Sequence, residues 1–237
     1  MTPEMQQLAT AESPAELWRA VRRYFRRQGF RSLAYFVTNR SGPSGGRKGF
    51  NIIHHGFTRE VTNAYIEEDW GSKDPGPAYS LAKGVAMRWR EIWEQIEPDA
   101  DQAAFLQRMR DAELGDGYSF PVFGPSGRNG CITVGRPVDE KIIWTVPVDD
   151  MHIYTQAAHM RLCQLLPDRP LEKPLSAREL QILDWVARGK SNGVIADILD
   201  LSGATVDTYL RRIYEKLEVS DRTSAAVRGV GMGLIAA

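Results

Sequence analysis

The sequence predicts an α+β protein, an N-terminal α-β-α sandwich followed by an all-α helix-turn-helix domain. In the first 165 residues, groups of short runs rich in β-branched and aromatic residues are flanked by amphipathic segments. The segment Leu166–Pro174 then places three prolines in nine residues, which disfavours a helix and predicts a short linker. The residues after it carry only helical patterns, broken by a turn at Leu201–Gly203.

Composition restricts the class of protein. The chain has 237 residues, 43% of them hydrophobic and 25% charged, which is typical of a globular chain. Its formal net charge is zero, so no global field steers it toward charged partners. Two cysteines give no disulfide framework, and no apolar run fits a signal peptide or a bilayer span. We therefore expect a cytoplasmic protein with no membrane partner.

The N-terminal elements follow in order. Ala15–Phe30 is predicted as a helix with one apolar face, and the arginines on its other face fit a solvated surface better than a nucleic-acid contact. Further helices are expected at Asp99–Ala112 and Met151–Leu166. Strands are expected at Ser32–Asn39, Gly49–His55, Tyr118–Phe123, Gly130–Arg136 and Lys141–Val146. Helices flanking a mainly antiparallel sheet leave room for a cavity between the layers.

The segment Phe57–Trp93 gathers aromatic side chains around one carboxylate, Asp74, which precedes Pro75. Two interpretations stay open from residue types alone. The first is ordinary core with an Asp-Pro turn at the surface. The second is an apolar pocket whose buried polar anchor suits a small amphiphile with an amide or hydroxyl donor.

Three helices are predicted after the linker: Ala177–Ala187, Asn192–Leu199 and one that begins after Ser202, a good N-cap residue. The last of these has an apolar face and an opposite face that is short, polar and arginine-bearing. Such a helix suits the DNA major groove. A plain helical bundle with solvated charges is the alternative. The apolar face consists of Val206, Leu210, Ile213 and Leu217.

These helices resemble the C-terminal DNA-binding domain of the LuxR family. The resemblance rests on Ser176-x-x-Glu179, Gly189-Lys190-Ser191-Asn192, Ile195-Ala196, Thr205-Val206, Lys216-Leu217 and Arg222-Thr223. It implies a four-helix domain whose third helix reads bases. By the resemblance, the groove-facing residues are Asp207, Thr208 and Arg211, and those near phosphates are Lys190, Ser191, Thr205 and Arg212.

The charge of this domain departs from what DNA binding favours. Residues 171–237 hold nine Lys and Arg against nine Asp and Glu. Asp207, on the expected reading face, repels phosphate; it either accepts from a cytosine amino group or is a poor position that a dimer tolerates. A single copy is therefore expected to bind weakly, and a homodimer on a palindromic operator is the usual remedy.

The N-terminal region resembles the autoinducer-binding domain of acyl-homoserine-lactone receptors. The matching residues are Tyr65, Asp74-Pro75, Trp89, Gly117-x-Ser119-x-Pro121 and Gly130-x-x-Thr133. The resemblance implies that Asp74 accepts from the ligand amide and that Thr133 donates to its carbonyl. It also implies that Trp89 packs on the ring and that Tyr65 lines the cavity. The expected domains are residues 1–165 and 175–237, joined by a linker at 166–174.

Two positions depart from that receptor pattern. The family's usual tryptophan, whose indole N–H binds the lactone carbonyl, is Val61 here, and a common tyrosine is Phe57. Both changes remove a donor and keep an apolar wall. Asn51 and His55 are candidate substitutes, although each is also explained by a structural or exposed role. The expected ligand-binding residues are Asn51, Phe57, Val61, Tyr65, Trp70, Asp74, Trp89 and Thr133.

The leading hypothesis is an atypical or orphan LuxR-type regulator that binds double-stranded DNA and an acyl-homoserine lactone or related signal, without a cofactor. The competing hypothesis is a ligand-independent protein that binds DNA constitutively, or that pairs with a related receptor and antagonises it. A metal site at His54-His55 is disfavoured, because neighbours in a strand point to opposite faces. No nucleophile elbow, P-loop or acid/base pair indicates an enzyme, and the alternating strand-helix pattern of a receiver domain is missing.

Overall fold

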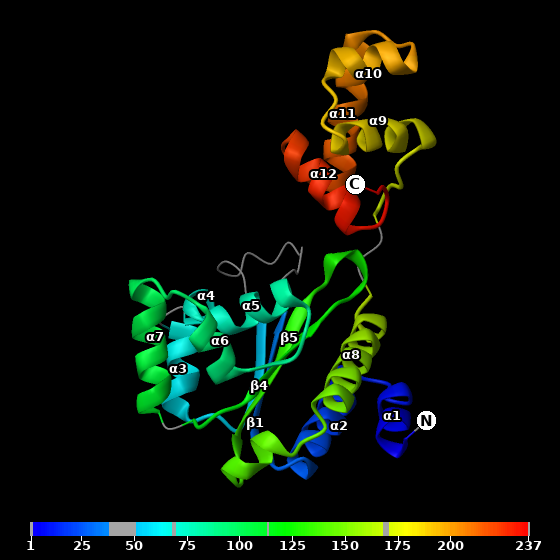
Figure 1. Ribbon diagram of the computed structural model, residues 1–237. Helices are drawn as coiled ribbons and strands as arrows, with labels where there is room; N and C mark the ends of the chain where they lie inside the picture. Colours follow the sequence, from blue (N-terminus) through cyan, green and yellow to red (C-terminus); the bar gives the residue numbers. More distant parts are fainter. Residues whose placement is uncertain (1, 38–50, 68–69, 113, 168–170, 237) are drawn as a thin grey trace. The chain divides into compact units, whose positions relative to one another are not determined.

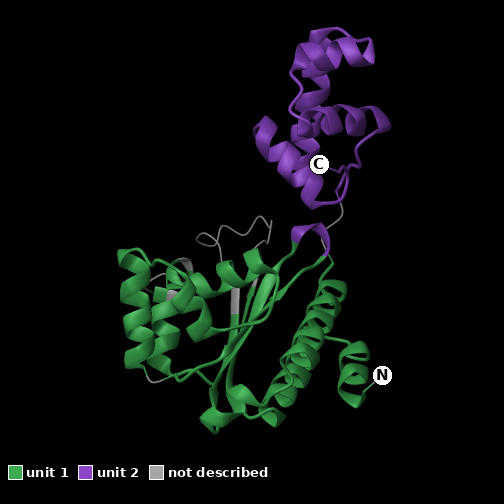
Figure 2. Cartoon of the chain, in the orientation of Figure 1, with its two compact units in different colours: residues 1–124, 128–167 green, residues 125–127, 168–237 purple. Residues whose placement is uncertain are grey.

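The computed structural model describes residues 2–37, 51–67, 70–112, 114–167 and 171–236; the side chains of residues 37, 51, 52, 66 and 72 lie outside the description. The chain forms two compact units (Figure 2). The first comprises Met1–Gly124 and Arg128–Pro167, and the second comprises Pro125–Gly127 and Asp168–Ala237. The bounds of the expected linker stay a prediction.

The first unit is built on a five-stranded sheet in the order β2-β1-β5-β4-β3, with every pair antiparallel. Side chains alternate between its two faces, so that Leu33 and Tyr35 of β1 enter one core while Ala34 and Phe36 face the other side. The mainly antiparallel sheet is confirmed. The strands are β1 (Phe30–Val37), β2 (Asn51–His55), β3 (Met87–Arg88), β4 (Tyr118–Val122) and β5 (Gly130–Pro137).

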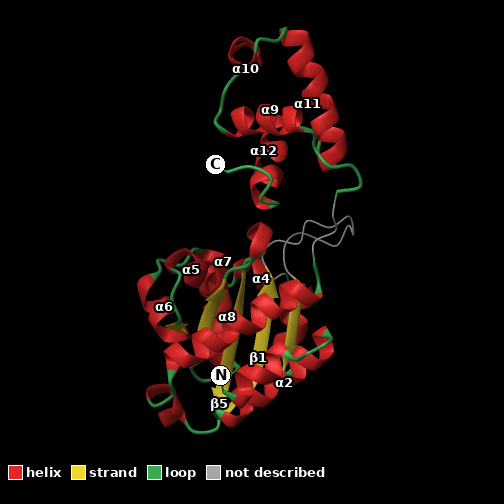
Figure 3. Ribbon diagram, turned by 90° about the vertical axis from the view of Figure 1, so that its right-hand side faces the viewer, coloured by secondary structure: helices red, strands yellow, loops and turns green. Residues whose placement is uncertain are grey.

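One face of the sheet is covered by α2 (Pro14–Arg27) and α8 (Val148–Leu165), with α1 (Pro3–Ala9) beside them (Figure 3). Phe25 and Phe120 are almost fully buried there. The rings of Tyr24 and Tyr154 stack with centroids 3.7 Å apart, which joins α2 to α8. Ser13 accepts from the Glu16 amide and Pro14 opens α2, so local sequence fixes where this helix begins.

Short helices cover the opposite face (Figure 1). The α-β-α sandwich is thereby confirmed. A separate apolar cluster, centred on Trp70, Trp89 and Phe105, fills much of the space between these helices and the sheet. The helices are α3 (Arg59–Glu67), α4 (Trp70–Lys73), α5 (Pro75–Lys83), α6 (Trp89–Gln95) and α7 (Ala100–Asp111).

Two predicted elements were wrong in part. Lys141–Val146 is not a strand but overlaps the 3-10 helix η2 (Glu140–Trp144), because the Asp139 carboxylate accepts from the Lys141 amide, 2.9 Å away, and turns the chain. The first long helix ends at Arg27, and Phe30 belongs to β1. The sequence pattern also missed β3, which has only two residues.

The second unit contains α9 (Ala177–Ala187), α10 (Asn192–Leu199), α11 (Gly203–Leu217) and α12 (Arg222–Gly231), which confirms the four-helix domain. Each helix begins after a side-chain N-cap, with Ser176, Ser191, Ser202 and Asp221 accepting from first-turn amides. The core joins Ile182, Ile195, Val206 and Ile213.

One buried ion pair fixes this core. The Lys216 Nζ lies 2.7 Å from the Glu179 carboxylate, whose residue is only 2% exposed. Burial alone would raise the pKa of Glu179, but the bonds from Lys216 and Ser176 outweigh it and hold the pKa below its ordinary value. Among the described residues, no helix combines the length and apolar character needed to cross a bilayer.

Candidate ligand cavity and nucleic-acid interface

A cavity lies between the sheet and the short helices of the first unit. Its volume is about 70 Å³. Six of the expected ligand-binding residues line it: Phe57, Val61, Tyr65, Asp74, Trp89 and Thr133. The remaining lining residues are Ala34, Phe36, His54, Thr62, Gly76, Trp93, Phe105, Met109 and Ser119.

Asp74 is the polar anchor of the cavity. The Tyr65 hydroxyl donates to its Oδ2 at 2.7 Å, and the Gly76 amide donates to its Oδ1 at 2.8 Å. Asp74 is also the N-cap of α5, and Pro75 opens that helix, so the carboxylate position is set by local backbone geometry. Each carboxylate oxygen can accept a second bond, which leaves capacity for a donor inside the cavity.

Burial governs the ionisation of this pair. It raises the pKa of the Asp74 carboxyl, although the bonds from Tyr65 and Gly76 oppose the change. Burial also raises the pKa of Tyr65, with the Asp74 charge adding to the effect, so the phenol keeps its proton. A neutral donor that reaches Asp74 would therefore meet a strong acceptor in apolar surroundings.

The floor of the cavity is a row of side chains across four strands. Strand register places His54 opposite Ala34, Ala34 opposite Thr133, and Thr133 opposite Ser119. Thr133 and Ser119 are 5% and 1% exposed, so their hydroxyls are buried on this face. Neighbouring strands lie about 4.8 Å apart, and the row therefore spans roughly 14 Å from His54 to Ser119.

Trp89 forms an end wall because two glycines leave room for its indole. A Cβ atom at Gly135 would lie 2.2 Å from Cη2 of Trp89, and one at Gly117 would lie 2.8 Å from its Cε2. The Trp89 amide also donates to the Gly117 carbonyl at 3.0 Å. These contacts explain why residues 117 and 135 are glycines.

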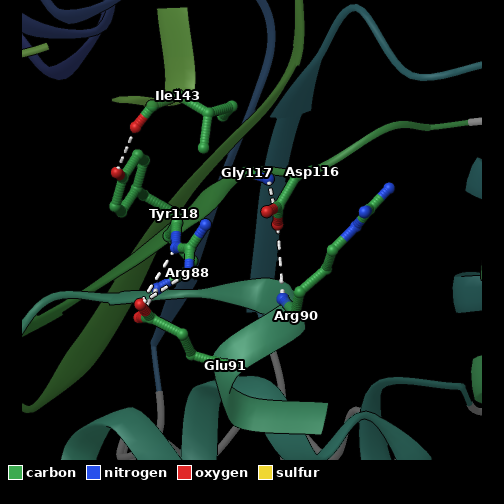
Figure 4. A network of polar contacts seen from close by, with 7 residues as sticks. All are labelled: Arg88, Arg90, Glu91, Asp116, Gly117, Tyr118 and Ile143. Carbon is green, nitrogen blue, oxygen red and sulfur yellow. Dashed lines mark hydrogen bonds and ion pairs between the residues drawn. The ribbon is translucent and has the colours of Figure 1, made fainter. Parts of the chain in front are cut away.

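A polar network fixes the start of α6 and with it Trp89 (Figure 4). The Arg88 amide and guanidinium donate to the Glu91 carboxylate at 3.1 and 2.9 Å, and the Arg90 amide donates to Asp116 at 3.3 Å. Tyr118, paired with Arg88 across the strands, donates to the Ile143 carbonyl at 2.6 Å. The cavity wall is thus tied to β4 and to η2.

The remaining expected residues fall in different places. Trp70 packs behind the wall, with its ring 5.5 Å from Phe105 and 6.3 Å from Tyr65. The hydroxyl of Tyr79, another aromatic residue of the segment Phe57–Trp93, donates to Gln95 at 2.9 Å. Neither Trp70 nor Tyr79 is among the side chains that line the cavity, so they leave it open. Asn51 begins β2, but its side chain lies outside the description.

His55, a candidate substitute contact that a structural or exposed role also explained, does not line the cavity. His55 lies on the other side of β2, where its Nε2 is 2.8 Å from the Arg22 guanidinium. His54 faces the cavity instead. Alternation along a strand predicts that only one of the two histidines lines the cavity, but only the pairing of Ala34 with His54 decides which one.

The exposed face of α11 carries Asp207, Thr208, Arg211 and Arg212. The Thr208 hydroxyl donates to the Ala204 carbonyl at 2.9 Å, which uses its one donor and leaves its lone pairs to accept. The Arg212 guanidinium lies 5.8 Å from the Tyr209 ring centre, a cation–π contact that restrains the side chain.

The residues expected near phosphates lie at helix starts. Ser191 caps α10, with Lys190 exposed beside it. Thr205 lies in the first turn of α11, where its hydroxyl is 2.8 Å from the capping Ser202 hydroxyl. Helix N-termini present free amides and a positive dipole end, which is favourable for phosphate.

A sandwich with a polar-anchored cavity, joined to a helix-turn-helix unit, defines a transcription regulator with a sensor domain. Residues 13–162 match the autoinducer binding domain, and residues 173–228 match the bacterial regulatory proteins of the luxR family. The chain belongs to the LuxR family of quorum-sensing transcription regulators.

Two related quorum-sensing regulators support this assignment. The chain is 29% identical over 186 residues to the quorum sensing-dependent regulator RpaR of Rhodopseudomonas palustris, covering 77% of this chain and 74% of the relative. It is 28% identical over 192 residues to the quorum-sensing regulator RhlR of Pseudomonas aeruginosa, covering 77% and 76%.

Two solved structures show the same fold. The crystal structure of Escherichia coli SdiA superposes with a TM-score of 0.71 at 18% identity, covering 97% of this chain and 95% of that one. SdiA in complex with octanoyl-rac-glycerol gives 0.69 at 17% identity, covering 97% and 93%.

Proposed function

We propose that this regulator binds, through Asp74, a small amphiphile with an amide or hydroxyl donor, and that it acts on DNA as a homodimer. The observation that carries the proposal is a carboxylate with spare acceptor capacity inside an open apolar cavity. A buried acceptor of this kind is costly unless a donor reaches it. Binding of the ligand would supply that donor.

Each polar group has a role in this proposal. Asp74 accepts from the ligand amide, and the Thr133 hydroxyl, buried on the floor, donates to the amide carbonyl. The Trp89 indole packs against the ring of the head group. Tyr65 orients the carboxylate by donating to Oδ2 and closes the wall beside it.

The head-group end is where this receptor departs from lactone receptors. Phe57 and Val61 line the cavity and offer no hydrogen-bond donor. A lactone carbonyl buried against them would lose its bonds to water without replacement. We infer that the preferred signal has a less polar head than a homoserine lactone, or binds in a pose that keeps its lactone carbonyl away from these two residues.

Affinity for DNA would depend on pairing two copies. Arg211 and Arg212 on α11 and Lys190 beside α10 supply the local positive charge of a domain that is neutral overall. Thr208 would present its methyl group and lone pairs to base edges. A dimer on a palindromic operator doubles every such contact. Ligand binding would favour that dimer by stabilising the folded sensor, which is simple linkage.

A second candidate function is a ligand-independent protein that binds DNA constitutively, or that pairs with a related receptor and antagonises it. The missing donors at Phe57 and Val61 favour it. The open cavity, which neither Trp70 nor Tyr79 fills, favours the ligand-binding function instead.

The experiment compares two amides that carry the same acyl chain, one on homoserine lactone and one on cyclopentylamine, which lacks the lactone carbonyl. Melting temperature and operator binding of the full chain are measured with each, and Asp74→Ala serves as the control variant. We expect the cyclopentyl amide to bind at least as tightly as the lactone, and Asp74→Ala to respond to neither. Tight operator binding by the free chain, with no shift for either amide, would support the ligand-independent function.

A further inference from the structure

A chain of hydrogen bonds joins three helices of the second unit at the side of the reading helix. The Asn192 side-chain amide donates to Oδ1 of Asp207 at 2.6 Å. Its carbonyl accepts from Nη1 of Arg222 at 2.9 Å. The other guanidinium nitrogen of Arg222 donates to the Lys190 carbonyl. The chain therefore runs from α11 through α10 to α12.

The chemistry of the three side chains allows one orientation of the Asn192 amide. Its NH₂ group faces the acidic Asp207, and its oxygen faces the cationic Arg222; the reversed amide would place like poles together at both ends. Both bonds are assisted by charge, so each is stronger than a bond between neutral groups. Arg222 also compensates the negative charge that Asp207 places on α11.

The positions of these residues give the chain of hydrogen bonds a mechanical role. Asn192 and Arg222 are the first residues of α10 and α12, and Asp207 lies in the second turn of α11. The bonds hold the start of α10, with the expected phosphate contacts Lys190 and Ser191, against the exposed face of α11. The hydrophobic core lies on the buried faces of these helices and does not include these polar groups.

We infer that Asp207 is a positioning residue and does not read a base. Through Asn192 it sets the start of α10 relative to α11, and so it sets affinity for every DNA sequence without choosing among bases. The inference rests on the proposed DNA-binding function. It replaces both explanations that the sequence leaves open, a contact with cytosine and a tolerated unfavourable charge.

The experiment uses the full chain with a randomised duplex library. The sequence that the wild type enriches becomes the probe for affinity. Asp207→Ala, Asn192→Ala and the double variant are compared with Asp207→Asn, which keeps an acceptor oxygen for Asn192 but removes the charge. Asp197→Asn, an exposed acidic position on α10, is the matched control for charge alone.

We expect Asp207→Ala to weaken binding about three- to tenfold, the size of one lost hydrogen bond, with unchanged base preferences. Asp207→Asn should restore wild-type affinity or exceed it by no more than Asp197→Asn does. In the Asn192→Ala background, Asp207→Ala should cause no further loss. A changed preference at one base pair in either Asp207 variant would overturn the inference, as would tighter binding by Asp207→Ala than by the wild type.

A measurement without DNA separates this inference from the proposed function. The side-chain NH₂ resonances of Asn192 should shift in Asp207→Ala and return toward wild type in Asp207→Asn. If no DNA sequence is enriched, the DNA-binding proposal fails while these resonances still report on the bond. If they do not move, the inference fails whatever the DNA result.

Discussion

The sheet of the first unit has a hollow on each face, and the two differ in their polar groups. The smaller hollow, about 40 Å³, lies under α2 and α8 beside Tyr35 and His159. There the two side chains bond each other at 2.6 Å, and the second imidazole nitrogen bonds the Arg128 carbonyl at 2.7 Å. In the larger hollow, Asp74 keeps acceptor capacity that no described side chain uses up. Spare bonding capacity, rather than empty space, distinguishes a candidate site from a packing defect.

The largest expected effect tests how completely each face is packed. Phe120→Ala, on the α2 and α8 face, should lower the free energy of unfolding by about 3–5 kcal/mol, because it creates a void among fully buried neighbours. Phe105→Ala should cost less, because one side of this ring already faces the cavity. Urea unfolding of the full chain measures both. Equal losses would show that the larger hollow is no looser than the opposite core.

The next effect concerns the acceptor itself. Asp74→Asn keeps the shape of the side chain but removes the charge that strengthens a ligand bond. We expect about 10- to 100-fold weaker binding of the cyclopentyl amide, measured by isothermal titration. Tyr35→Phe, beside the smaller hollow, should leave that affinity unchanged. Comparable losses in the two variants would erase the distinction between the hollows.

The buried groups at the two hollows, Asp74 and His159, should contribute to stability with opposite dependence on pH. Burial raises the pKa of Asp74, so its contribution to stability is complete below the unfolded carboxyl pKa of about 3.9 and is lost as pH rises through the folded pKa. Burial lowers the pKa of His159, so its contribution is present above about pH 6.5 and is lost as pH falls through the folded pKa.

Melting temperature against pH, without ligand, checks these signs. Asp74→Asn should remove part of the loss of stability that accompanies a rise in pH through the folded Asp74 pKa, and His159→Gln should remove part of the loss that accompanies a fall in pH through the folded His159 pKa. If Asp74→Asn instead changed the loss of stability at falling pH, or His159→Gln the loss at rising pH, the burial of that group would be contradicted.

A smaller effect is expected where the Trp89 indole packs against Gly135. Gly135→Ala would bring a methyl group into the indole and should cost about 1–3 kcal/mol of stability, together with ligand affinity. Gly193→Ala, whose added Cβ meets no atom within 4 Å, is the matched control. Circular dichroism melting and titration measure the two losses. An unchanged affinity in Gly135→Ala would show that the indole position does not matter to the ligand.

The smallest expected effect comes from removing one hydroxyl group at each hollow, that of Thr133 at the larger and that of Tyr35 at the smaller. Thr133→Val should weaken ligand binding about two- to tenfold with little change in stability, because the hydroxyl is needed only when ligand is present. Tyr35→Phe should instead lower stability by about 1 kcal/mol, since Nδ1 of His159 loses its bond to the Tyr35 hydroxyl. Titration and urea unfolding of both variants measure these losses. A loss of stability in Thr133→Val and a loss of ligand affinity in Tyr35→Phe would contradict the comparison.

Local signals made the second unit predictable. Ser176, Ser191 and Ser202 each cap a helix by accepting from a nearby amide, and such caps are visible in the sequence. The bond from Asn192 to Asp207 spans fifteen residues and has no such signal. The sequence therefore predicted the helices but not the contact that accounts for Asp207.

The first unit was less predictable because long-range pairing decides it. The segment Lys141–Val146 has the β-branched and aromatic residues of a strand, yet the Asp139 cap turns it into a 3-10 helix. The resemblance to autoinducer-binding domains indicated Asp74, Trp89 and Thr133. Ser119 and His54 join the cavity floor through strand register, which a single sequence does not reveal.

Ala34 lies between His54 and Thr133 in the floor of the larger cavity, and its single methyl group has a consequence for how the receptor diversifies. A bulkier residue there would narrow the space above the sheet without touching Asp74 or Trp89. One codon change from alanine to valine could thus favour thinner acyl chains over branched or aromatic ones, while amide recognition stays intact. A change in the width of the cavity alone would then be enough for related receptors to diverge in ligand specificity.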